Sequence, residues 1–94
     1  MNEDDSTQIF SPGYYIQQHL QTHGWNQAEF AAILGRPLQV VNELIAGKRA
    51  VTPETATGLA EAFGTSVEVW LRLEAIYQAS KLEKDPSIAL RAKV

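Results

Sequence analysis

The chain has 94 residues, enough for one domain, and 45% of them are apolar, as in an ordinary globular protein. It contains no cysteine, which excludes a disulfide framework, a thiolate zinc site and a cysteine nucleophile. No signal peptide and no apolar stretch of roughly 20 residues is present, so we expect a cytoplasmic protein that does not cross a membrane. The formal net charge is −3, whereas nucleic-acid-binding domains are usually basic, so any DNA-binding surface must be a local positive patch.

Proline and glycine residues divide the chain into five predicted helices, most of which end at a glycine. The expected spans are residues 13–23, 27–34, 37–46, 53–63 and 66–81, and Pro86 is a candidate start for a short sixth piece. Asn26 and Glu29 have the spacing of a capping box at the start of the second helix. Because no run alternates with period two, the predicted fold class is all-α with no sheet.

Three regions are expected along the chain. Residues 1–11 form a flexible tail that contains Glu3, Asp4 and Asp5. Residues 12–81 form the helical domain, and residues 82–94 form an extension or the start of a linker to a further domain. The predicted core follows the helical spacing of apolar residues and aromatic rings. Its members are Tyr15, Ile16, His19, Leu20, Trp25, Phe30, Ile33, Leu34, Val41, Leu44, Ile45, Ala56, Leu59, Ala60, Phe63, Trp70, Leu71, Leu73 and Tyr77.

The most informative segment is residues 27–49, where two short helices are joined by a tight turn that contains Gly35. This pattern is typical of a helix-turn-helix unit, and the small Ala31 would let the two helices cross closely. On a helical wheel of the third helix, one face points inward with Val41, Leu44 and Ile45. The opposite face points outward with Gln39, Asn42, Glu43 and Ala46.

Amide side chains on the outward face suit the reading of DNA bases. Glutamine and asparagine pair bidentately with adenine, so Gln39 and Asn42 are the best candidates for base readout, and Val40 can touch a thymine methyl group. Glu43 would repel phosphates unless it reads cytosine or pairs with Arg36, Lys48 or Arg49. The full candidate set for DNA binding, with phosphate contacts included, is Gln27, Arg36, Leu38, Gln39, Val40, Asn42, Glu43, Lys48 and Arg49.

The chain resembles the HigA/VapI-type antitoxins, a branch of the lambda-repressor-like (XRE-type) helix-turn-helix regulators. The resemblance covers residues 11–80 and is carried by GWNQAEFAAILG (24–35), by the Gly-Lys-Arg-x-(Ile/Val)-Thr-Pro run at 47–53 and by the Trp-Leu-x-Leu run at 70–73. It implies a five-helix bacterial regulator that dimerises, represses its own operon and has an RNA-cleaving toxin as a possible partner. The sequence departs from the family pattern at Pro37 and Glu43, which bears on DNA affinity and sequence preference more than on the fold.

The fifth predicted helix carries apolar residues on more than one side, whereas one core needs only one stripe. It is either a terminal helix buried between its neighbours or part of a two-fold dimer interface. In the second case the interface residues are Val69, Trp70, Leu73, Ile76 and Tyr77.

Other functions are compatible with parts of the sequence. Gln39 and Asn42 could be ordinary solvated residues, but the flanking glycines and Lys48–Arg49 favour DNA contacts. The acidic balance also suits a protein-interaction module that holds a toxin, and the chain could be the DNA-targeting part of a longer regulator. His19 and His23 lie one helical turn apart but lack a third metal ligand, so no metal or cofactor is expected. No nucleophile elbow, phosphate loop or carboxylate pair indicates an enzyme.

Overall fold

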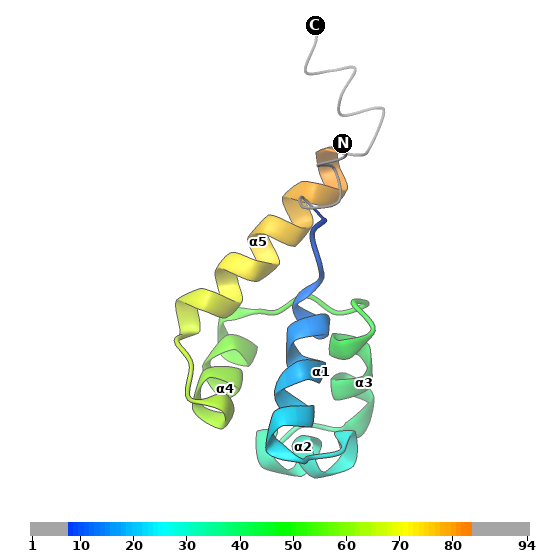
Figure 1. The fold of residues 1–94 in the computed structure, drawn as a ribbon, viewed down its shortest axis with the longest axis vertical. Coiled ribbons are helices and arrows are strands. Elements are labelled where there is room, and N and C mark those ends of the chain that lie inside the picture. Colours follow the sequence, from blue (N-terminus) through cyan, green and yellow to red (C-terminus); the bar gives the residue numbers. More distant parts are fainter. Residues whose placement is uncertain (1–7, 84–94) are drawn as a thin grey trace, which may run out of the picture.

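The computed structural model describes residues 8–83, and within that range it contains five α-helices and no strand (Figure 1). They are α1 (Pro12–His23), α2 (Gln27–Leu34), α3 (Leu38–Ile45), α4 (Pro53–Phe63) and α5 (Val67–Glu83). All five predicted helices are confirmed, and no end differs from its expected position by more than two residues. The acidic tail residues and the candidate helix at Pro86 lie outside the described residues.

The ends of α2 and α3 follow from local chemistry. The Asn26 side chain accepts a hydrogen bond from the Glu29 backbone N–H at 2.7 Å, and Glu29 Oε1 accepts from the Asn26 N–H at 2.8 Å. The predicted capping box is therefore present. Gly35 ends α2 with a φ of 75°, a left-handed conformation that glycine adopts without strain. Pro37 precedes the first turn of α3 rather than lying in it, because its ψ of 148° is not helical.

An aromatic cluster forms the centre of the core. The Phe63 ring lies 5.0 Å from the Phe30 ring, 4.4 Å from His19 and 5.9 Å from Trp70, measured between ring centroids. Phe30 and Trp70 are at most 1% exposed. These contacts join α1, α2, α4 and α5 around one side chain, as the predicted core requires.

The predicted core is confirmed except at two positions: Tyr77 is partly buried but is not part of the core cluster, and Ile33 is exposed. Ile33 is 48% exposed, because it lies on the outer side of α2 beside Gly58, Glu61 and Ala62 of α4. The buried residues outside the predicted core include Ala31 of α2, Val51 in the connection before α4, Thr55 of α4 and Glu74 on the inner side of α5.

Helix α1 packs directly on the end of α3 through Gly13. A Cβ atom at Gly13 would lie 2.3 Å from the carbonyl oxygens of Leu44 and of Ile45. Only a glycine permits this approach, so α1 and α3 meet backbone to backbone. The contact fixes the tilt of α3 against the rest of the domain.

Helix α5 leans across α4 and α1, and its second half extends beyond the other helices (Figure 1). Trp70 anchors its first half: the indole is 1% exposed and donates from Nε1 to Thr65 Oγ1 at 2.8 Å. Val69 and Ile76 are 46% and 44% exposed on another side of the helix. None of the helices in residues 8–83 combines the length and the apolarity needed to cross a membrane.

Candidate DNA-binding surface

Helix α3 lies at one edge of the domain, and none of the other helices in residues 8–83 covers its outer side (Figure 1). Val41 and Leu44 face inward and are at most 2% exposed. Gln39 and Asn42 are exposed, and Glu43 is partly exposed. The inward and outward faces predicted from the helical wheel are thus confirmed, and the amide side chains are accessible from solvent.

Three side chains on this outer face form one hydrogen-bonded chain. Gln39 Nε2 donates to Glu43 Oε2 at 3.1 Å, and Arg49 Nε donates to Glu43 Oε1 at 2.9 Å. Arg49 Nη2 lies 2.7 Å from the same Oε1, which makes the contact a close ion pair. The hydrogen bond from Arg49 and then that from Gln39 hold the pKa of the Glu43 carboxyl below its ordinary value. Glu43 therefore pairs with Arg49, one of the partners that the sequence offered.

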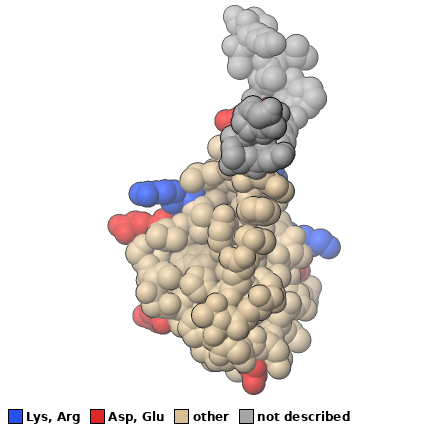
Figure 2. All heavy atoms as spheres, in the orientation of Figure 1, with Lys and Arg blue, Asp and Glu red and all other residues tan. Residues whose placement is uncertain are grey.

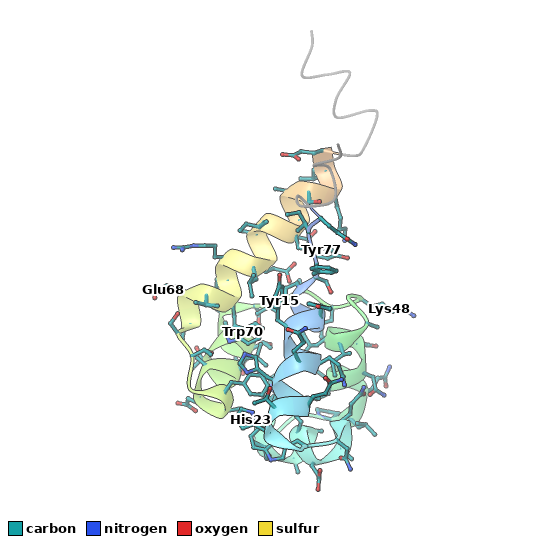
Figure 3. All side chains as sticks on the ribbon, viewed as in Figure 1. Tyr15, His23, Lys48, Glu68, Trp70 and Tyr77 are labelled. Atoms are coloured by element: carbon teal, nitrogen blue, oxygen red, sulfur yellow. The ribbon has the colours of Figure 1, made fainter. Side chains whose placement is uncertain are left out.

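The remaining basic candidates flank α3. Arg36 lies in the turn before α3, and its Nη2 is 3.0 Å from Glu54 Oε2 at the first turn of α4. Lys48 follows α3, forms no ion pair with any of residues 8–83, and points away from the body of the domain (Figure 3). Figure 2 shows that the centre of the broad face is uncharged and that charged side chains lie at its margin. Among the positive groups, Arg36, Lys48 and Arg49 lie beside α3, whereas Arg72 and Lys81 lie on α5.

The two apolar candidates differ in exposure. Leu38 is 45% exposed at the first turn of α3, whereas Val40 is partly buried and packs against the core. Leu38 is consequently better placed than Val40 to meet a thymine methyl group.

The start of α2 offers backbone donors. The capping box uses the N–H groups of Asn26 and Glu29. The N–H groups of Gln27 and Ala28, in the first turn, have no intrahelical acceptor, as at any helix start. The positive end of the helix dipole lies at the same place and favours a phosphate there.

Sequence reasoning missed the buried carboxylate that supports the basic segment. Glu74 Oε1 accepts a hydrogen bond from the Val51 backbone N–H at 2.9 Å, and Gln78 donates to its other oxygen. Val51 comes two residues after Arg49, so α5 holds the connection that carries the basic pair. The available signal was that Glu74 falls one helical turn after Trp70, on the inner side of α5.

The two histidines of α1 each stack on an aromatic ring, and His19 is partly buried whereas His23 is exposed. His19 stacks on Phe63 at 4.4 Å and His23 stacks on Trp25 at 4.4 Å, measured between centroids. Burial lowers the pKa of His19, and the neighbouring His23 lowers it further, so the neutral ring is favoured. Among residues 8–83 no group of three His, Cys, Asp or Glu side chains is arranged to hold a metal ion.

The residues proposed for a dimer interface divide between two sides of α5. Trp70 is 1% exposed and has almost no surface to offer to a second subunit. Tyr77 is partly buried and its hydroxyl lies close to Gly47 (Figure 3). Leu73 is also partly buried, and only Val69 and Ile76 are well exposed.

Two helices joined by a tight turn, with the second exposed at an edge, define a helix-turn-helix DNA-binding fold. Residues 16–70 match the helix-turn-helix family HTH_3, and the chain belongs to this family. The HTH-type transcriptional regulator YddM of Escherichia coli (strain K12) is 31% identical over 78 residues, which are 83% of each chain. The predicted fold and the absence of enzymatic activity are thereby confirmed.

Solved structures extend the comparison. An addiction module antidote protein of the HigA family from Coxiella burnetii superposes with a TM-score of 0.83 at 27% identity, covering 94% of this chain and 97% of that one. The Pseudomonas aeruginosa antitoxin HigA, solved with the higBA promoter, has a TM-score of 0.84 at 19% identity and covers 93% of this chain and 96% of that one, which shows a shared fold. The resemblance to HigA-type antitoxins is confirmed.

Proposed function

We propose that this regulator is a homodimeric, cytoplasmic repressor of the antitoxin type, which binds the operator of its own operon and has an RNA-cleaving toxin as a partner. The observation that carries the DNA-binding part is the outward amide face of α3, which Lys48 and Arg49 follow directly. The named HigA relatives support the antitoxin assignment.

In this proposal α3 enters the major groove and its first turns reach the bases. Gln39 and Asn42 read base edges, and Leu38 or Val40 contacts a thymine methyl group. Phosphates bind Lys48, Arg49 and Arg36, and the backbone N–H of Gln27 at the start of α2. The Arg36–Glu54 ion pair is a surface pair of small net strength, so a phosphate can displace Glu54 from the guanidinium.

Gln39→Ala tests the readout directly. The variant removes a bidentate partner for one base pair, so it is expected to lose about 1–3 kcal/mol on the preferred site and to relax preference at one position only. Sites are first selected by the parent protein from a pool of randomised duplexes, and affinities are then measured on single-base variants of the winning site. Equal discrimination by variant and parent at every position would show that Gln39 does not read DNA.

The proposed dimer uses the exposed side of α5, where Val69 and Ile76 lie two turns apart beside Leu73. Two-fold symmetry would place two α3 helices about 34 Å apart, so that both reach successive turns of the major groove.

Ile76→Asp places a charge on this side and is expected to convert the dimer to a monomer, because a desolvated carboxylate without a partner is costly at an interface. Sedimentation equilibrium reports the mass. Ala75→Asp is the matched control, because it adds the same charge to the next residue of α5, about 100° round the helix. The proposed interface would be contradicted if the parent sediments as a monomer. It would also be contradicted if the Ile76→Asp and Ala75→Asp variants have the same mass.

A second function is favoured by one observation: Arg36 and Arg49 are both paired with glutamates, which reduces the positive charge beside α3. The protein would then act mainly by holding a partner protein, with α5 and the acidic tail residues Glu3 to Asp5 as the contacts. The same selection separates the two functions, because a parent that enriches no sequence at low salt is not an operator-binding repressor.

A further inference from the structure

We propose that Glu43 is a specificity-determining residue: it holds the Gln39 amide in one orientation and thereby makes Gln39 select adenine over guanine. The inference rests on the proposed function, in which α3 lies in the major groove. It is carried by the hydrogen-bonded chain from Gln39 through Glu43 to Arg49.

The chemistry of the two groups fixes the amide orientation. An ionised carboxylate only accepts hydrogen bonds, whereas a glutamine amide has an NH2 end that donates and a carbonyl end that accepts. Glu43 Oε2 can therefore pair only with the NH2 end of Gln39, as the 3.1 Å contact to Nε2 shows. The lowered pKa of the Glu43 carboxyl keeps it ionised, and so an acceptor, at neutral pH.

The orientation determines what Gln39 can offer to a base. One N–H is used by Glu43, which leaves one donor and one acceptor side by side. Adenine presents an N7 acceptor and an N6 donor in the major groove, and this matches the remaining groups. Guanine presents two acceptors, N7 and O6, and would need both N–H groups of the amide. Glu43 withholds one of them.

Arg49 makes this arrangement possible on a DNA-facing helix. It occupies Glu43 Oε1 from two nitrogens, at 2.9 Å and 2.7 Å, so both carboxylate oxygens are engaged and the charge is neutralised locally. A cytosine N4 would therefore have to share a carboxylate oxygen of Glu43 with Gln39 or Arg49. Glu43 therefore acts through Gln39 and not as a reader of its own base pair.

The experiment compares Glu43→Ala and Glu43→Gln with the parent. Both variants remove one negative charge, so both are expected to bind all duplexes more tightly and with a steeper salt dependence. Only the glutamine variant keeps a side-chain oxygen that can accept from Gln39 Nε2. Comparison of the two variants therefore separates the effect of the Gln39 amide orientation from the effect of the lost charge.

The readout is the ratio of dissociation constants for adenine and guanine at the base pair that Gln39→Ala identifies. We expect the parent to prefer adenine by about tenfold or more. The ratio should fall to about threefold or less in Glu43→Ala and take an intermediate value in Glu43→Gln. Circular dichroism melting of the three proteins checks that each is folded.

Two results would overturn the inference alone. In the first, Glu43→Ala binds every duplex more tightly and leaves the adenine-to-guanine ratio unchanged, which assigns Glu43 a purely electrostatic effect. In the second, discrimination is lost at a base pair other than that of Gln39, which makes Glu43 a direct reader. A parent that selects no sequence, or whose Gln39→Ala variant discriminates normally, instead overturns the proposed readout, and this inference with it.

Discussion

Replacing Lys48 and Arg49 together by alanine is expected to weaken binding to every duplex sequence alike. Each phosphate contact contributes about 0.9 to the slope of log K against log salt, so a dimer that loses four contacts loses about 3 to 4 units of slope. When the salt concentration rises from about 50 to 200 mM, the affinity of the parent for DNA would then fall about 100-fold more than the affinity of the variant. The measurement is a fluorescence-anisotropy titration of one operator duplex and one unrelated duplex at several salt concentrations.

The Lys48→Ala and Arg49→Ala single variants should differ in DNA affinity, because only Arg49 neutralises a carboxylate. Lys48→Ala removes one positive charge, whereas Arg49→Ala also leaves Glu43 without its ion-pair partner at 2.7 Å. The Glu43 carboxylate would then face the phosphates, so we expect Arg49→Ala to weaken binding more than Lys48→Ala does. Lys81→Ala is the control: it removes a positive charge from the last turn of α5, which extends away from α3 (Figure 1). A salt slope that is the same for the double variant and the parent would remove both residues from the interface.

Gly13→Ala is expected to destabilise the fold more than any exposed substitution. The new Cβ atom would lie 2.3 Å from two carbonyl oxygens of α3, and backbone cannot move aside as a side chain can. Overpacking of this kind costs about 1–3 kcal/mol, which exceeds the gain of about 0.5–1 kcal/mol that alanine brings to a helix. Urea unfolding followed by circular dichroism gives the change in free energy of unfolding.

Gly58→Ala is the matched control for this prediction. It is also a helical glycine, but its Cβ would meet only Leu34 Cδ1 at 2.9 Å, the far end of a side chain that can rotate. We expect a change within about 1 kcal/mol in either direction, because helix propensity offsets the contact. If Gly13→Ala were as stable as Gly58→Ala, α1 and α3 would not meet backbone to backbone.

The helices and their ends could be predicted from the sequence because the signals are local. Asn26 with Glu29, and Thr52 with Pro53, specify helix starts through contacts within one turn. The inward face of α3 followed from periodicity in the same way. Ile33 was misplaced because its burial depends on how closely α4 approaches α2, a tertiary distance that the helical period does not contain.

The candidate site was predictable as a surface but not as a network. Periodicity places Gln39 and Glu43 on one exposed face, and the sequence offers Arg36, Lys48 and Arg49 as partners for Glu43 without distinguishing among them. The partner depends on how the chain turns after α3 and brings Arg49 back over that helix. The Arg36–Glu54 pair and the Glu74–Val51 hydrogen bond each join a residue of a connection to a helix further along the chain, and only the assembled fold brings them together.

The buried Glu74 carboxylate has a consequence for cooperativity. It connects α5, the proposed site of self-association, to the backbone that directly follows the basic pair. If α5 shifts when two subunits associate, one hydrogen bond would transmit the shift to Lys48 and Arg49. Neither a second domain nor a bound effector would be needed. Linkage is reciprocal, so an operator that orders these two residues would in turn strengthen the association of the two subunits.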